Sequence, residues 1–169
     1  MHNALSIKQP FEKGLLRFLL ICIALCHFAF AKDLDIAQFL QEAQKQDKHL
    51  LFFHHIPRCP YCKTMLDENF QDTAMKREIE KNFILVDIYT ATQGNVKYKD
   101  FRGSYKEFSL HVGAFAYPAT IFMNSKGEII HEAIGYRNRE EYTHELLYVS
   151  SKSYQKMDLQ EFIVQKEMQ

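Results

Sequence analysis

The sequence lacks an excess of charge of either sign, because 21 Lys and Arg balance 21 Asp and Glu over 169 residues. Proteins that bind nucleic acid or another polyanion usually carry a basic patch or stripe, so this balance argues against such partners. Internal repeats and low-complexity linkers are also missing. Tryptophan is absent, although phenylalanine and tyrosine are plentiful. The length suits one globular domain with a real core.

The sequence also lacks an apolar run long enough for a confident membrane span, which needs about 20 residues. Its main apolar run, residues 18–30, follows three basic residues and ends in a small-x-small pattern at 29–31. These features are typical of a secretory signal peptide. We therefore predict a signal peptide over residues 1–31, a single mature domain over 32–169, and a periplasmic or otherwise exported protein. An uncleaved membrane anchor is the alternative.

Cysteine is scarce as well, with four in the chain, and Cys22 and Cys26 lie within the predicted signal peptide. Cleavage leaves Cys59 and Cys62 as the cysteines of the mature chain. In an oxidising compartment, one closely spaced pair with no spare thiol fits a redox enzyme better than a disulfide scaffold. Cleavage also removes three basic residues and one acidic residue, which leaves 18 Lys and Arg against 20 Asp and Glu, a formal charge of −2. That charge indicates no electrostatic partner.

The pair stands in a CPYC motif at residues 59–62, between an apolar stretch typical of a buried strand and a helical apolar pattern. Pro60 suits the first helical turn, where a missing N–H costs nothing. Cys59 then lies beside the free N–H groups of the helix start, and Arg58 adds a full positive charge. Both effects lower the pKa of the Cys59 thiol from its usual value of about 8.5. Because the thiolate is the form that attacks disulfides, the motif predicts a redox dithiol.

Two other roles are open to the pair. A structural disulfide between Cys59 and Cys62 would close too small a loop to stabilise the fold much. A metal-binding or chaperone module would use the two thiols with His54 or His55 just upstream. Zinc sites usually need a second ligand pair elsewhere, and the sequence has no second CxxC pair. Redox chemistry is therefore the preferred interpretation, and no metal is expected.

Apolar periodicity predicts alternating helices and strands in the mature chain. The first helix, residues 33–45, has Asp33 or Asp35 as its cap. Strands at 50–54 and 83–89 flank the helix of the motif, so they should be parallel, and apolar residues on both faces of 83–89 indicate a central strand. The other expected elements are a helix at 72–81, a small hairpin within 96–101, helices at 104–111, at 138–149 and from Asp158, and an antiparallel strand pair at 119–123 and 128–133.

This order of elements resembles the thioredoxin fold over residues 33–149. A second point of resemblance is Tyr117-Pro118, because thioredoxin-like proteins carry a cis-proline facing the dithiol just before the third core strand, and cis is cheap only at X-Pro bonds. The resemblance implies an α/β fold with a central mixed sheet flanked by helices. The signal peptide, the CPYC motif and a short insert before the third core strand, residues 96–103, are most similar to exported SoxW-type thioredoxins.

The sequence departs from ordinary thioredoxins at three places. Arg58 stands where they carry a tryptophan, and Phe53 stands where they keep a buried aspartate that relays protons. Tyr117 replaces the small or β-branched residue common before the cis-proline, which is expected to alter substrate choice. Any base must come from water, from His54 or His55, or from elsewhere. For both histidines, a packing or surface role is favoured over catalysis.

The resemblance implies a thiol–disulfide oxidoreductase that needs no cofactor. The Cys59 thiolate is expected to attack a protein disulfide, and Cys62 is expected to resolve the mixed disulfide. The expected direction is reduction, with electrons from a membrane carrier, and the same chemistry run as an oxidant or isomerase is the alternative. The expected partners are protein disulfides or dithiols, not nucleic acid, and the protein is expected to be a monomer. The expected site residues are the catalytic Cys59 and Cys62, the modulating Arg58, and the substrate-binding Pro60, Tyr61, Tyr117 and Pro118.

Overall fold

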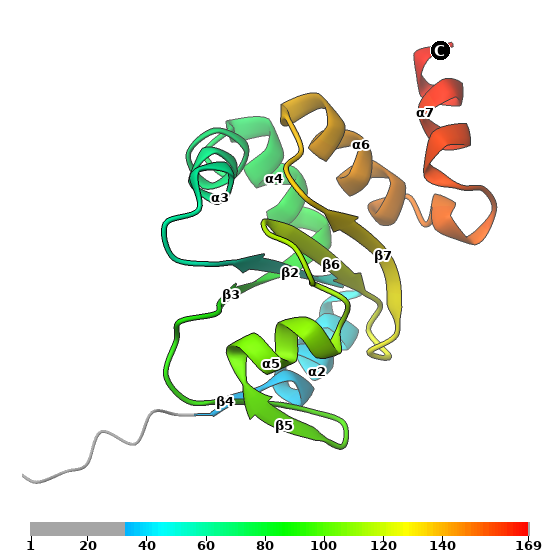
Figure 1. Cartoon of the computed structure of the whole chain (residues 1–169). Helices are drawn as coiled ribbons and strands as arrows, with labels where there is room; N and C mark the ends of the chain where they lie inside the picture. The colour runs from blue at the N-terminus through cyan, green and yellow to red at the C-terminus, as the bar shows by residue number, and fades with distance from the viewer. Residues whose placement is uncertain (1–32, 169) are drawn as a thin grey trace, which may run out of the picture. The chain divides into compact units, whose positions relative to one another are not determined.

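Four strands form the central sheet in the computed structural model, which describes residues 33–168 (Figure 1). Their bounds are His49–His55 for β2, Phe83–Tyr89 for β3, Ala119–Met123 for β6 and Ile129–Ile134 for β7. The strands lie in the order β3-β2-β6-β7. β2 is parallel to β3 and antiparallel to β6, and β6 is antiparallel to β7, so the sheet is mixed, as predicted. The predicted signal peptide lies outside the described residues.

The place of β3 at one edge of this sheet shows that the prediction of a central strand at 83–89 is wrong. β3 is apolar on both faces because helices cover both faces of the sheet, and such coverage does not depend on having two strand neighbours. Val86 and Ile88 are buried on one face, whereas Leu85 on the other is 43% exposed. The central strands are β2 and β6, and all residues of β2 except His55 are buried.

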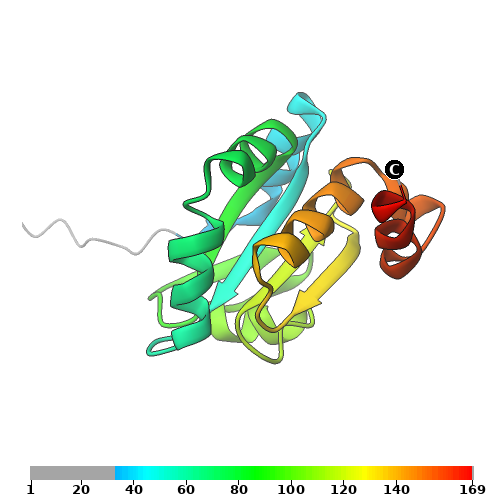
Figure 2. The same ribbon diagram turned by 90° about the horizontal axis from the view of Figure 1, so that it is seen from above.

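The helices that cover the sheet are α2 (Ile36–Gln46), α4 (Thr73–Asn82), α5 (Tyr105–His111) and α6 (Arg139–Ser150), and a further helix, α7 (Leu159–Glu167), packs against α6. Successive side chains of a strand point to opposite faces, so β2 contributes to two cores. Leu50 and Phe52 pack with residues of α2 and α5. Leu51 and Phe53 pack with residues of α4, α6 and α7. The two layers of helices are visible on either side of the sheet in Figures 1 and 2.

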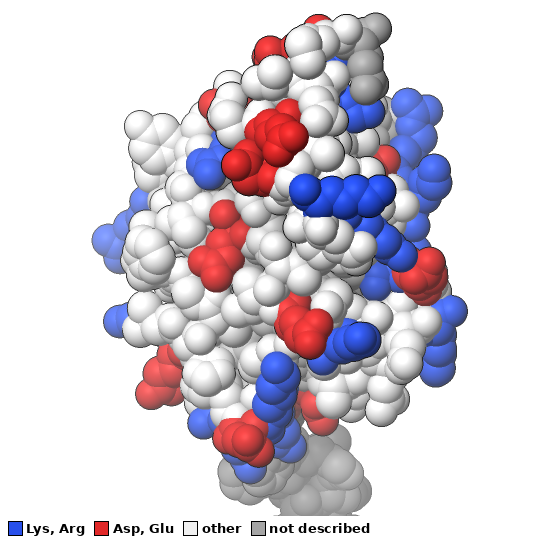
Figure 3. All heavy atoms as spheres, turned by 90° about the vertical axis from the view of Figure 1, so that its right-hand side faces the viewer, with Lys and Arg blue, Asp and Glu red and all other residues white. Residues whose placement is uncertain are grey.

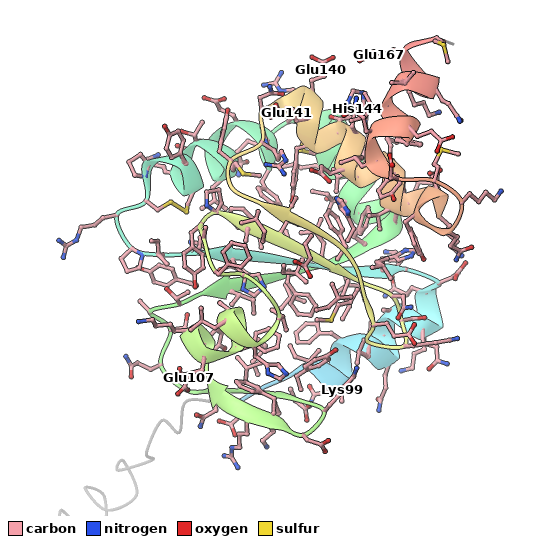
Figure 4. The ribbon with its side chains drawn as sticks, turned by 45° about the vertical axis from the view of Figure 1, so that its right-hand side comes forward. Lys99, Glu107, Glu140, Glu141, His144 and Glu167 are labelled. Atoms are coloured by element: carbon pink, nitrogen blue, oxygen red, sulfur yellow. A yellow bond between two sulfur atoms is a disulfide. The ribbon has the colours of Figure 1, made fainter. Side chains whose placement is uncertain are left out.

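Each of these helices begins after a residue whose side chain caps it, namely Asp35, Asp72, Ser104, Asn138 and Asp158. A cap satisfies N–H groups that have no partner within the helix. Four of these helices, α4, α5, α6 and α7, begin one residue after the start that the sequence predicted. For α2 the structure selects Asp35, whereas Asp33 forms an ion pair with Arg102 at 2.8 Å (Oδ2–Nη2). At α5, Glu107 (Figure 4) completes the cap by accepting a hydrogen bond from the Ser104 N–H.

A second, smaller sheet forms from the insert that precedes β6. Its hairpin consists of β4 (Asn95–Tyr98) and the antiparallel β5 (Phe101–Ser104), which confirms the predicted hairpin. The chain turns between them at Lys99 (φ 52°; Figure 4). A third strand, β1 (Leu34–Asp35), pairs in parallel with β4 and was not predicted. Two residues carry no periodic pattern, so nothing in the sequence marks this strand.

Charged side chains of both signs lie interspersed among neutral ones on the face shown in Figure 3. This distribution agrees with the balanced composition of the sequence. Among the helices of residues 33–168, none has both the length and the apolar character needed to cross a membrane.

Candidate active site

The CPYC motif lies at the carboxyl end of β2, where α3 (Pro60–Thr64) begins. Cys59 is the N-cap of α3, and its Sγ accepts a hydrogen bond from the backbone N–H of Cys62 at 3.1 Å. The two sulfurs form a disulfide, and the two Cα atoms are 5.2 Å apart. Cys59 is half-buried, whereas Cys62 is only 2% exposed. The two sulfurs therefore differ in access and in hydrogen bonding.

Arg58 is the residue at which the chain turns into α3. Its φ is 57°, in the left-handed region that residues other than glycine seldom adopt, and it is exposed. None of the ion pairs among residues 33–168 includes Arg58. Its positive charge, one residue from Cys59, is therefore not compensated by a carboxylate within the described part of the chain.

A hollow of about 490 Å³ opens beside the dithiol and is lined by both cysteines. One wall is formed by His55 and Tyr89 at the carboxyl ends of β2 and β3, with stacked rings whose centroids are 4.8 Å apart. The Nε2 of His55 lies 2.8 Å from a carboxylate oxygen of Asp87. Because a carboxylate only accepts hydrogen bonds, that nitrogen carries the proton. The apolar lining of the hollow comes from Ile56, Pro57, Pro60 and Leu66.

The Tyr117–Pro118 peptide bond is cis and lies directly before β6. The carbonyl oxygen of Pro118 accepts a hydrogen bond from the N–H of Gly135 at 2.8 Å, which joins this segment to the loop after β7. In that loop, Tyr136 packs against Tyr61 of the motif, with ring centroids 5.6 Å apart. The structure thus connects the two predicted halves of the site through one loop. Tyr136 itself was not predicted as a site residue.

A family model described as a thioredoxin-like domain matches residues 36–150, which is more than half of the chain. The chain belongs to the thioredoxin-like family. With its disulfide-bonded CxxC pair at a helix start, this thioredoxin-like protein is a thiol–disulfide oxidoreductase.

Solved structures share the fold of this thioredoxin-like protein at low sequence identity. A thioredoxin-fold protein from Helicobacter pylori has a TM-score of 0.60 at 18% identity, over 71% of this chain and 80% of that one. A thioredoxin from Thermus thermophilus gives 0.55 at 21% identity, over 70% and 85%. A putative disulphide-isomerase from Bacteroides thetaiotaomicron gives 0.55 at 23% identity, over 71% and 92%. No curated protein matches the sequence.

The side chain at the place of the usual thioredoxin aspartate is fully apolar in this family member. Phe53 is buried, and its ring centroid lies 4.7 Å from that of Phe70. It packs in the core beneath α4 and α6, together with Met65 from the segment after α3. That segment, Met65–Asn69, is π-helical. The core below the dithiol is therefore hydrophobic where ordinary thioredoxins place a carboxylate.

His54 points to the opposite face of the sheet, where it packs against Phe108 of α5. Its Nδ1 lies 2.9 Å from the Oγ of Ser109, and that hydroxyl donates to the carbonyl oxygen of Tyr105. A hydroxyl has one proton, so the Nδ1–H of His54 must donate to Ser109. Burial, and secondarily the charge of His55, lowers the pKa of His54 to about 3. His54 is therefore a neutral packing residue at physiological pH.

The metal-binding alternative has little support in the described residues. Within residues 33–168 there is no group of three His, Cys, Asp or Glu side chains placed to hold a metal ion. Both histidines next to the motif have other partners, because His54 bonds to Ser109 and His55 to Asp87.

A buried ionic cluster behind the site was missed by the sequence reasoning. Glu145 of α6 is 2% exposed and contacts His131 of β7 as well as Arg137, whose Nε donates to it at 2.9 Å. The carbonyl oxygen of Arg137 accepts a hydrogen bond from Asn69 at 2.8 Å. The cluster therefore ties the loop that carries Tyr136 to the helix that follows the motif. These residues lie far apart in the sequence, and no local pattern marks them.

Proposed function

We propose that this protein is exported and reduces disulfide bonds of other proteins through Cys59 and Cys62. The proposal rests on the difference in exposure and hydrogen bonding between the two cysteines. Cys59 is half-buried and its sulfur accepts a hydrogen bond from an N–H at the start of α3, whereas Cys62 is almost fully buried. An accessible sulfur at a helix start suits the attacking thiol, and a buried sulfur suits the resolving thiol.

Reduction of a substrate takes two thiol–disulfide exchanges. The Cys59 thiolate attacks one sulfur of the substrate disulfide, a new S–S bond forms, and the other substrate sulfur leaves as a thiolate that takes up a proton. Cys62 then loses its proton and attacks Cys59, and the second substrate sulfur leaves as a thiolate. Two electrons have passed to the substrate. The protein ends with the Cys59–Cys62 disulfide, which is the state in this structure.

We assign the substrate-binding face to Pro60 and Tyr61 of the motif together with Tyr117 and Pro118 before β6. Two observations support the assignment. Tyr61 is 63% exposed beside the dithiol, and the loop after β7 contacts both halves of this face. Arg58 modulates the reaction through its charge, which favours the thiolate of Cys59.

The direction of electron flow depends on how strongly the reduced pair is stabilised, since a very stable thiolate makes a strong oxidant. Arg58 and the start of α3 stabilise the thiolate, but Pro60 and Tyr61 bring no polar donor as close to it as a histidine between the cysteines would. We place the reduction potential at roughly −180 to −250 mV, in the range of glutaredoxins and disulfide isomerases. At such a potential the protein acts as a reductant when a membrane electron carrier keeps its dithiol reduced.

The test combines two measurements. Equilibration in glutathione buffers gives the reduction potential, and alkylation of free thiols in intact cells with a mass-tagged maleimide gives the state of the CPYC pair. We expect an intermediate potential and a largely reduced pair. A fully oxidised pair in growing cells, with a potential near about −120 mV, would show that the protein is an oxidant.

A further inference from the structure

The outer edge of β3 has no strand partner within residues 33–168, where β3 pairs only with β2. The first strand of the described chain, β1, pairs with β4 in the smaller sheet instead. The N–H and C=O groups on the outer side of an edge strand are ready to pair with another extended chain. β3 therefore offers a backbone template along its whole length, Phe83–Tyr89.

A largely apolar hollow of about 450 Å³ lies beside this edge. Phe83, Leu85 and Asp87 of β3 line it on one side, and α4 and the π-helical segment contribute Ile79, Leu66 and other residues. Leu85 is 43% exposed, which is unusual for a leucine in the main sheet. An extended chain paired with β3 would place alternate side chains over this hollow.

This hollow and the hollow at the dithiol share one lining residue. Leu66 lines both this hollow and the 490 Å³ hollow at Cys59, and the strand continues from Leu85 to Tyr89, which lines the second one. The five residues from Leu85 to Tyr89 are separated by four steps and span about 13 Å of strand, which one short extended segment can cover. β3 is parallel to β2, so its carboxyl end lies at the same end of the sheet as the motif.

We propose that the edge of β3 and the hollow lined by Leu85 bind an extended segment of the substrate protein. This segment lies next to the cysteine whose disulfide is reduced by Cys59. This inference rests on the proposed function and names its substrate class: unfolded or flexible segments with an apolar side chain a few residues from a disulfide. The edge selects an extended backbone because only such a chain satisfies its row of donors and acceptors. Leu66, which lines both hollows, and Tyr89, which lines the hollow at Cys59, place this docking edge next to the reacting sulfur.

The test compares two probes with the same leaving group, 2-nitro-5-thiobenzoate in a mixed disulfide with cysteine. In one probe the cysteine lies in a twelve-residue unstructured peptide with a leucine four residues away, and in the other it is a single blocked residue. The measured quantity is the ratio of the second-order rate constants, peptide over single residue, for the reduced full-length protein. We expect Leu85→Lys to lower this ratio at least fivefold.

The matched control is Ile129→Lys on β7, the opposite edge of the same sheet, where Ile129 is 39% exposed. This control should keep the wild-type ratio, and Leu85→Thr, which suits an edge strand, should lower it as Leu85→Lys does.

A wild-type ratio near one, or equal ratios in the Leu85 and Ile129 variants, would overturn the docking edge while leaving the proposed function intact. If the wild type reduces neither probe, the proposed function fails and the inference fails with it. If light scattering shows a dimer that Leu85→Lys dissociates, the edge is an interface between two copies and not a substrate site.

Discussion

The backbone N–H of Cys62 donates a hydrogen bond to the Sγ of Cys59, with a distance of 3.1 Å between nitrogen and sulfur. The bond follows from the position of Cys59 as the N-cap of α3, because the N–H groups of the first turn have no partner within the helix. A negative charge on Cys59 strengthens this bond, whereas Cys62 lies inside the helix and gains no such donor. The attacking thiolate is therefore expected at Cys59.

Replacing Cys62 with serine should trap substrate proteins as stable mixed disulfides on Cys59, because the resolving thiol is gone. Replacing Cys59 with serine should trap none, since Cys62 is buried. Non-reducing electrophoresis of the two variants purified from cells gives the measurement. Equal trapping by both variants would contradict the assignment of roles.

Replacing Arg58 with glutamate should raise the pKa of the reduced Cys59 thiol, because a neighbouring positive charge becomes negative. At neutral pH the thiolate fraction, and with it the alkylation rate of Cys59 by iodoacetamide, should fall by about three- to tenfold. The pH dependence of that rate, measured with Cys62→Ser as the background, gives the pKa directly. Arg77→Glu, at an exposed position of α4, is the charge-matched control and should leave the profile in place. A profile that does not move in the Arg58 variant would show that the residue has no influence on the thiol.

Local signals in the sequence were enough to predict the helix starts, the motif at the end of β2 and the hairpin of the insert. A cap such as Asp72 lies within three residues of the N–H groups that it binds. The interaction is therefore local, and the sequence around the cap is enough to predict it. The edge position of β3 and the cluster around Glu145 were not predictable in this way. Both depend on contacts between residues that are distant in the sequence. The same holds for Asp33, which pairs with Arg102 and does not cap α2. Apolar residues on both faces of β3 fit the helices on both sides of the sheet, but they carry no information about whether the strand has one neighbouring strand or two.

The buried His54 should make the protein less stable in acid. Its pKa is lowered to about 3 in the folded protein, against an ordinary value of about 6.5 in the unfolded chain. Between these values the unfolded chain binds a proton that the folded protein does not bind, so this contribution to stability is complete above about pH 6.5 and declines as the pH falls towards 3. The slope is at most that of one proton, roughly 1.4 kcal/mol per pH unit. His54→Phe should flatten the pH dependence of the unfolding free energy in urea between pH 6 and about 4. An unchanged slope would show that His54 is not the group responsible.

The native protein should begin at Lys32. The basic start, the short apolar core and the small-x-small pattern at 29–31 predict removal of residues 1–31 during export. Intact-mass spectrometry of the protein from fractionated cells locates the N-terminus, and Ala31→Arg should block cleavage because the site requires a small residue. An unprocessed chain beginning at Met1 in the cytoplasmic fraction would contradict export. Such a chain would also keep the thiols of Cys22 and Cys26.

The ion pair between Glu145 and Arg137 should hold the loop that carries Tyr136. Glu145→Ala would leave Arg137 and His131 without their buried carboxylate, and losing hydrogen bonds to a charged group costs about 1.5–3 kcal/mol of the free energy of unfolding. Because Tyr136 packs beside the motif, the variant should also react more slowly with protein disulfides. The control is Glu140→Ala, at an exposed position near the start of the same helix (Figure 4), which should change stability by well under about 1 kcal/mol. Urea unfolding measures the first effect, and insulin reduction at equal folded concentration measures the second. If stability falls but the rate with insulin does not, the cluster supports the core and has no part in positioning Tyr136.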